Sequence, residues 1–171
     1  MGMITRRSLA VLATFLLSAA VIAGGIIPAQ ASPAQASAAP APGPMLTGIR
    51  TGVHPTFDRI VLDFTGGRPG VQNSRFVDEL TRDPSGQIEW LTGCAFAEVV
   101  LFPAYAHDGA GHPSLAGPQK FRTRNLTNVM AVAVTGDFEA TLSIGVGMRK
   151  QTWINVFTLT GPDRVVIDVG R

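Results

Sequence analysis

Three histidines and one aspartate are the side chains of this sequence best suited to chemistry. His107, Asp108 and His112 lie within one short glycine-containing segment, and His54 lies far upstream. If these groups converged they could hold a metal ion, because catalytic zinc uses three protein ligands and keeps one position open. Such a site would support metal-dependent or hydrolytic chemistry in a small enzyme.

No catalytic motif accompanies these histidines. The chain contains neither the H-E-x-x-H zinc motif nor the G-x-S-x-G nucleophile motif. We interpret residues 104–117 as a long surface loop in which His107 and His112 are solvated or bonded within turns. We therefore predict no enzymatic activity, no metal and no cofactor. The enzyme remains an alternative that depends on His107, Asp108 and His112 converging with His54.

Cys94 is the single cysteine of the chain, so it cannot form an internal disulfide. The sequence Leu91-Thr92-Gly93-Cys94 resembles a lipobox, but a lipobox cysteine directly follows an export signal and this one lies in mid-chain. We expect Cys94 to be a buried, small apolar side chain.

An internal repeat offers a second group of candidate residues. Phe57-Asp-Arg-Ile-Val-Leu-Asp-Phe64 matches Pro162-Asp-Arg-Val-Val-Ile-Asp-Val169. Alternation along a strand sends successive side chains to opposite faces. The core-facing residues are then Ile60, Leu62 and Phe64 in the first copy and Val165, Ile167 and Val169 in the second.

The opposite face of the repeat carries Arg59, Asp63, Arg164 and Asp168. These side chains either pair with one another, which stabilises an exposed strand by less than about 1 kcal/mol, or bind a ligand. The ligand-binding interpretation assigns these four residues as the site. The repeat also predicts two equivalent strands, and with them two related sheets in a pseudo-symmetric sandwich.

Period-two apolar patterning extends over most of the chain after residue 44, which indicates an all-β fold. Short strands separated by turn residues are typical of a sandwich or barrel, and we predict a two-sheet β-sandwich. The expected strands are 46–51, 58–64, 71–79, 96–102, 129–135, 140–146, 152–158 and 164–169. The expected turns are Gly66-Gly67, Asp83-Pro84-Ser85-Gly86, Gly136-Asp137 and Gly161-Pro162-Asp163.

The N-terminal segment has the order of an export signal. Arg6 and Arg7 precede an uncharged apolar run and small residues of the A-x-A type, after which cleavage could follow Ala31 or Ala36. The paired arginines are compatible with either general or twin-arginine export. We expect a signal peptide at 1–31, a disordered Ala/Pro-rich spacer at 32–44 and one folded domain at 45–171.

The expected location is therefore secreted or attached to the cell envelope. Membrane contact would arise only through the signal segment, were it left uncleaved.

Net charge argues against nucleic acid as a partner. The chain has 14 Lys and Arg against 12 Asp and Glu, and two of the bases are Arg6 and Arg7. Without that segment the basic and acidic residues balance, so no positive field remains to attract a polyanion.

Trp90 and Trp153 are expected in the core. A tryptophan outside the core and beside polar residues would instead suggest stacking on a carbohydrate.

Taken together, these segments resemble the AMIN-like domain of bacterial secreted proteins and lipoproteins, a relative of the AMIN domain of cell-wall amidases. The matching pieces are Arg50–His54, Phe57–Phe64, Gly67–Gly70, Phe76–Glu79, Ala106–Asp108, Gly136–Ala140, Gly145–Gly147, Phe157–Leu159 and Pro162–Val169.

The resemblance implies a β-sandwich that localises proteins in the envelope by binding peptidoglycan. It therefore implies an exported, non-catalytic module whose partner is a cell-wall polymer or a cell-envelope protein.

Overall fold

The computed structural model describes residues 43–171, so the predicted signal peptide and nearly all of the predicted spacer lie outside the described residues. The described part contains eleven strands and no helix, which confirms the all-β prediction. No helix in this part is long and apolar enough to cross a membrane.

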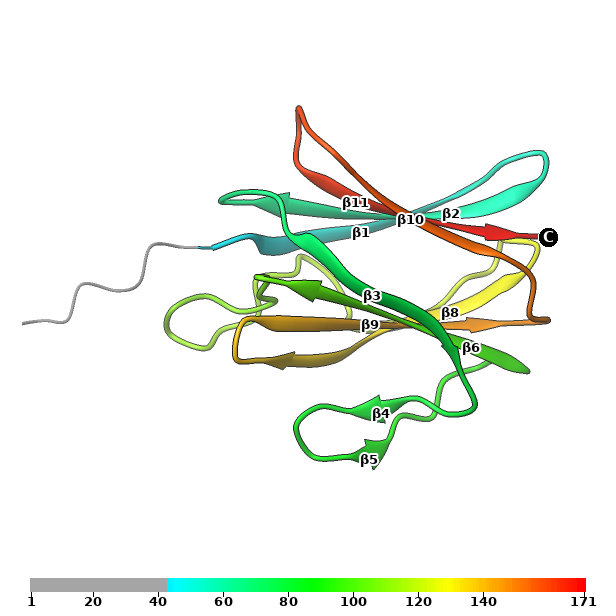
Figure 1. The fold of residues 1–171 in the computed structure, drawn as a ribbon, viewed down its shortest axis with the longest axis horizontal. Helices are drawn as coiled ribbons and strands as arrows, with labels where there is room; N and C mark the ends of the chain where they lie inside the picture. Colours follow the sequence, from blue (N-terminus) through cyan, green and yellow to red (C-terminus); the bar gives the residue numbers. More distant parts are fainter. Residues whose placement is uncertain (1–42) are drawn as a thin grey trace, which may run out of the picture. The chain divides into compact units, whose positions relative to one another are not determined.

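Two antiparallel sheets form a β-sandwich (Figure 1). The four-stranded sheet has the order β1-β2-β11-β10. Its strands are β1 (Met45–Val53), β2 (Phe57–Thr65), β11 (Arg164–Gly170) and β10 (Ile154–Leu159). The five-stranded sheet has the order β3-β6-β9-β8-β7. Its strands are β3 (Gly70–Val77), β6 (Ala95–Phe102), β9 (Thr141–Met148), β8 (Val129–Phe138) and β7 (Lys120–Arg122).

A small hairpin of β4 (Thr81–Arg82) and β5 (Gln87–Ile88) lies outside the two main sheets. All eight predicted strands are present, but β4, β5 and β7 were not predicted, because strands of two or three residues are too short to show alternation.

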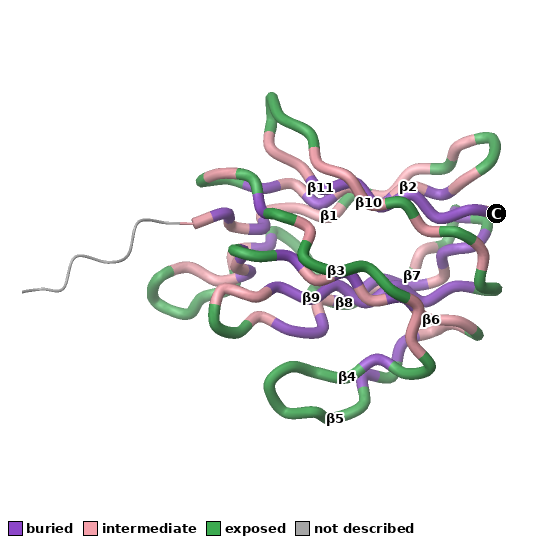
Figure 2. The backbone as a smooth tube through the Cα atoms, in the orientation of Figure 1, coloured by how far each residue is buried: buried purple, intermediate pink, exposed green. Residues whose placement is uncertain are grey.

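The core lies between the two main sheets, as the buried stretches of Figure 2 show. Ile60, Leu62 and Phe64 of β2 and the matching residues of β11 point into it, which confirms the assignment of the core face. Val99 and Ile144 of the opposite sheet belong to the same apolar cluster. Apolar burial of this kind is the main stabilising contribution to a sandwich of this size.

The two copies of the repeat are neighbours within one sheet. In the register between β2 and β11, Val61 pairs with Val166, Arg59 with Asp168 and Asp63 with Arg164. The expectation that the repeat relates two sheets is therefore wrong. An antiparallel pair of like strands is instead related by a local two-fold axis, so each arginine faces the aspartate of the other copy.

The face of β11 turned away from the core is also buried, which the alternation did not indicate. Val166 is 1% and Asp168 is 5% exposed. The reason is that β11 lies between two other strands. Val166 has Val61 of β2 on one side and Phe157 of β10 on the other.

One predicted turn is wrong. Gly136 and Asp137 lie inside β8, and the chain reverses at Glu139 and Ala140, which have φ of 49° and 61°. Gly136 is required for another reason: a Cβ there would lie 2.8 Å from the Cβ of Asp83, so the glycine lets the β4–β5 hairpin approach β8.

Three further residues lie at the surface rather than in the core. Cys94 is exposed, and its backbone N–H donates to the Met148 carbonyl at the start of β6. Trp90 is 80% and Trp153 is 49% exposed. Trp90 follows the β4–β5 hairpin outside the sandwich, whereas Trp153 immediately precedes β10 on the outer side of its sheet.

Candidate functional site

The register of the four-stranded sheet sets the side chains facing away from the core in rows across the strands. We call this surface the outer sheet face. It consists of Arg50, Phe57, Arg59, Val61, Asp63, Trp153, Asn155, Phe157, Leu159, Arg164, Val166 and Asp168. It contains all four residues that the repeat assigned as a ligand site.

Arg59 and Asp168 form the central polar pair of the outer sheet face. Nε and Nη2 of Arg59 donate to the two Asp168 carboxylate oxygens at 2.7 and 2.8 Å. The guanidinium carbon lies 5.1 Å from the ring centre of Phe57 and 5.6 Å from that of Phe157. The hydrogen bond to Asp168 raises the pKa of Arg59, so this cation is fixed in position and in charge.

Asp63 has a partner that the sequence did not indicate. Arg50 of β1 donates to its two oxygens at 2.6 and 2.7 Å, and this bond raises the pKa of Arg50. Gly48 leaves room for the aspartate, because a Cβ there would lie 3.3 Å from Asp63 Oδ2. Alternation along the first predicted strand could have placed Arg50 on the face that points away from the core. Pairing it with Asp63, however, requires the register between the two strands, which the sequence does not provide.

Arg164 lies opposite Asp63 in register yet donates to the Pro162 carbonyl at 3.1 Å. The outer sheet face thus holds three arginines and two aspartates, one positive charge in excess. The predicted mutual pairing is therefore found for Arg59 with Asp168, while Asp63 and Arg164 have separate partners.

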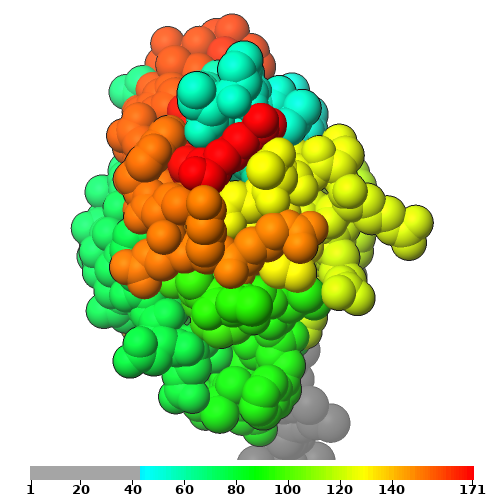
Figure 3. All heavy atoms as spheres, turned by 90° about the vertical axis from the view of Figure 1, so that its right-hand side faces the viewer, coloured from blue at the N-terminus to red at the C-terminus, as the bar shows by residue number. Residues whose placement is uncertain are grey.

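An aromatic row borders this polar pair. His54 stacks on Phe57 with ring centres 4.5 Å apart, and Phe57 lies 6.2 Å from Trp153 at an interplanar angle of 55°. These residues come from the β1–β2 turn, from β2 and from the segment before β10. Figure 3 shows the same segments (cyan and orange) on either side of the red C-terminal residues at one end of the sandwich.

A buried polar network positions this end of the sheet. The Asp58 carboxylate, fully buried in β2, accepts the backbone N–H groups of Asn128 and Val129 at 2.6 and 3.0 Å. Asn128 Nδ2 donates to the Gly170 carbonyl at 2.7 Å, and the Thr152 hydroxyl donates to the same oxygen at 2.9 Å. These hydrogen bonds connect Thr152, the residue before Trp153, to both sheets. Sequence reasoning missed Asp58, although a carboxylate in line with three core residues was visible in the repeat.

The histidine loop shows a different arrangement. His107 Nδ1 lies 2.6 Å from an Asp137 oxygen. Asp108 accepts the backbone N–H groups of Ala110 and His112, both at 2.9 Å, and these bonds lower its pKa. The loop hydrogen-bonds to the beginning of β1 through Tyr105, whereas His54 follows the end of that strand.

The convergence that the enzyme alternative requires is therefore not observed. Within residues 43–171 no three His, Cys, Asp or Glu side chains are placed to hold a metal ion.

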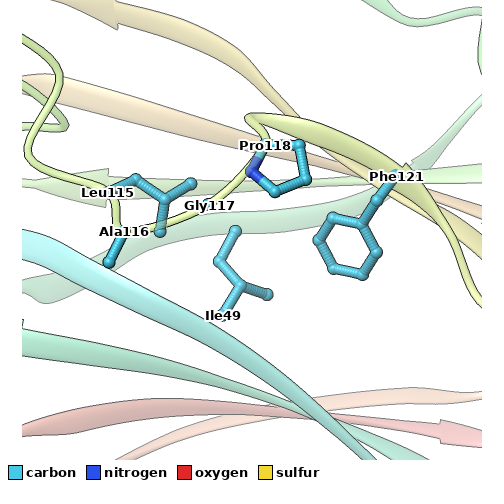
Figure 4. A pocket seen from close by; sticks show the side chains of 6 residues that line it. All are labelled: Ile49, Leu115, Ala116, Gly117, Pro118 and Phe121. Atoms are coloured by element: carbon cyan, nitrogen blue, oxygen red, sulfur yellow. The ribbon is translucent and has the colours of Figure 1, made fainter.

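A cleft of about 300 Å³ opens beside β1 and β7. Its lining is apolar (Figure 4): Ile49, Leu115, Ala116, Gly117, Pro118 and Phe121. None of these side chains can act as acid, base, nucleophile or metal ligand. Ile49 points from the inner side of β1, so the cleft lies at the open edge between the sheets and is separate from the outer sheet face.

A third cluster holds the β4–β5 hairpin. Glu89 is 4% exposed and accepts hydrogen bonds from Arg82 and Lys120, and Lys120 also donates to the Trp90 carbonyl. Burial alone would raise the pKa of Glu89, but the bonds from Lys120 and Arg82 outweigh it and lower that pKa. This cluster attaches the hairpin to β7.

Comparison with known proteins identifies a family. The family model for the AMIN-like domain matches residues 44–171. No curated protein and no solved structure matches the chain. Because the match covers the whole described sandwich, including both copies of the repeat and the outer sheet face, the chain belongs to the AMIN-like domain family.

Proposed function

We propose that this protein is an exported, non-catalytic module that holds itself, or a protein it accompanies, at the cell envelope by binding peptidoglycan. The outer sheet face is the binding surface. Membership in the AMIN-like family, a relative of the AMIN domain of cell-wall amidases, supports a cell-wall role. The export signal expected at residues 1–31 would deliver the protein to that ligand.

The observation that carries the proposal is the Arg59–Asp168 pair enclosed by aromatic rings. Its two hydrogen bonds use Nε and Nη2 of the arginine, and in the described part of the chain no hydrogen bond engages Nη1. That nitrogen can donate to a ligand without breaking the pair. Asn155, exposed and in register with Asp168, adds an amide that both donates and accepts.

Peptidoglycan fits such a surface because it presents hydroxyls, amides and occasional carboxylates. The single excess positive charge, carried by Arg164, matches sparse carboxylates better than it matches a dense polyanion. An open sheet face buries little ligand area, so we expect modest affinity for one repeat unit. A repeating polymer compensates through several simultaneous contacts.

Cosedimentation with purified sacculi at about 0.15 M salt, where exposed charges are largely screened, tests the proposal. Wild-type protein should pellet, and an Arg59→Ala, Arg164→Ala double variant should remain largely in the supernatant. The matched control is Arg75→Ala, Arg122→Ala, which removes the same charge from exposed positions of the five-stranded sheet. Thermal unfolding of each variant establishes that it is folded.

Wild-type protein that stays in the supernatant would overturn the proposal. A folded Arg59, Arg164 double variant that pellets as well as wild type would remove these two residues from the binding surface.

A further inference from the structure

Trp153 has an unusual position for a tryptophan. A Cβ built on Gly170 would lie 2.5, 2.7 and 2.8 Å from the indole atoms Nε1, Cε2 and Cδ1. Three ring atoms at nearly equal distance mean that the flat face of the indole rests on the backbone of Gly170. The side chain is nonetheless 49% exposed, so the indole surface that it offers to solvent lies away from this backbone.

Two hydrogen bonds hold this arrangement. The Gly170 N–H donates to the Trp153 carbonyl at 3.0 Å, and the Thr152 hydroxyl donates to the Gly170 carbonyl at 2.9 Å. The backbone beneath and before the indole is therefore fixed before any ligand arrives. Binding then needs little ordering of the protein, which lowers its entropic cost.

We infer that the exposed face of Trp153 stacks against the sugar rings of a glycan strand. The inference rests on the proposed function and specifies which part of the polymer the outer sheet face holds. The electron-rich face of an indole attracts the weakly positive C–H groups on one side of a pyranose ring.

The neighbours of Trp153 supply what a stacked sugar needs at its edges. Phe57, inclined at 55° to the indole, extends the aromatic surface toward β2. Asn155 follows Trp153 as the next residue of β10 on the same face, and Arg59 follows Phe57 in the same way on β2. The Nη1 donors of Arg59 are available to a ligand. Ring hydroxyls and N-acyl oxygens would meet these polar groups while the ring itself covers the indole.

The charges favour a glycan over a densely charged chain. Asp168 already balances Arg59, and Asp63 already balances Arg50. A polyanion would find one unbalanced arginine, and a polycation would find no unbalanced carboxylate on this face. A mostly uncharged sugar chain requires neither an excess of arginines nor an unbalanced carboxylate.

Tryptophan fluorescence gives a direct test, because the chain has two tryptophans. The purified exported protein carrying Trp90→Phe reports on Trp153 alone, and the Trp153→Phe variant reports on Trp90 alone. Each is titrated with soluble oligomers of N-acetylglucosamine and, separately, with a free peptidoglycan stem peptide. The glycan oligomer should shift the Trp153 emission saturably and leave the Trp90 emission unchanged.

Two substitutions test the geometry through binding to sacculi. Trp153→Ala should weaken binding about tenfold, the loss expected for one aromatic contact. Gly170→Ala should do the same, because its Cβ displaces the indole while the tryptophan remains. Gly109→Ala, where a Cβ meets nothing within 4 Å, is the matched control and should bind like wild type.

The outcomes separate this inference from the proposed function. Protein that pellets with sacculi, ignores the glycan oligomers and responds to the stem peptide would overturn glycan stacking and leave the proposed function standing. Saturable titration of Trp90 instead of Trp153 would also overturn it. Protein that fails to pellet with sacculi yet titrates Trp153 with glycan would support stacking and overturn peptidoglycan as the ligand.

Discussion

Asp58 connects the two sheets through buried hydrogen bonds. Its buried carboxylate accepts two backbone N–H groups from the start of β8 and lies 3.4 Å from Nε of Arg171. Asp58→Ala leaves these donors without an acceptor, so it should lower the free energy of unfolding by about 3–5 kcal/mol. Urea denaturation at neutral pH measures the loss.

The repeat supplies a matched control for this prediction. Asp163 holds the same place in the second copy but is only partly buried. Asp163→Ala should therefore cost less than about 1 kcal/mol. Equal losses at the two aspartates would show that the buried network does not join the sheets in the way described.

The two faces of β2 should respond differently to truncation of their side chains. Leu62 is fully buried between the sheets, so Leu62→Ala should lower the free energy of unfolding by about 2–5 kcal/mol. Ile167→Ala in β11 should cost a similar amount for the same reason. Val61, the next residue on the outer side of β2, is partly exposed, and Val61→Ala should cost about 1 kcal/mol or less. Denaturation midpoints for the three variants check this, and a loss at Val61 exceeding that at Leu62 would invert the face assignment.

The β4–β5 hairpin should show a pH-dependent attachment. The pKa of Glu89 is lowered from its ordinary value of 4.5 by Lys120 and Arg82, so the folded state holds this proton less tightly than the unfolded state. The resulting stability is complete above the unfolded pKa and disappears as the pH falls through the folded pKa. At about pH 7, Glu89→Gln should lower the free energy of unfolding by about 1–3 kcal/mol.

The difference between wild type and Glu89→Gln should shrink as the pH falls through the folded pKa of Glu89, because the wild-type carboxylate then takes up a proton and loses its ion pairs. Glu79→Gln, at an exposed position, serves as the control and should change the stability little over the same pH range. A Glu89→Gln effect that is independent of pH would mean that the ion pairs do not stabilise the hairpin.

The fold class, the long strands and the core faces of β2 and β11 could be predicted from the sequence. Alternation in β2 and β11 identified Leu62 and Ile167 as buried because period-two patterning depends only on neighbours along the chain. Strand order depends on contacts distant in sequence. For that reason the adjacency of the repeat strands, the Arg50–Asp63 pair and the burial of Val166 could not be predicted.

The candidate site could be predicted only in part, because it too depends on contacts between residues distant in sequence. The four charged residues of the repeat do share one face, but their aromatic border depends on register and on a turn. Trp153 was expected in the core because large aromatic residues usually bury most of their surface. Its exposure follows from a backbone contact with Gly170 that no local pattern indicates.

An NMR titration of isotope-labelled protein with soluble peptidoglycan fragments tests directly whether the outer sheet face binds the envelope polymer. The largest amide and side-chain shifts should fall on Arg59, Trp153, Asn155 and Asp168, with little change at the cleft residues Leu115 and Phe121. Shifts concentrated at the cleft or around Trp90, with the outer sheet face unchanged, would show that the outer sheet face is not the binding surface.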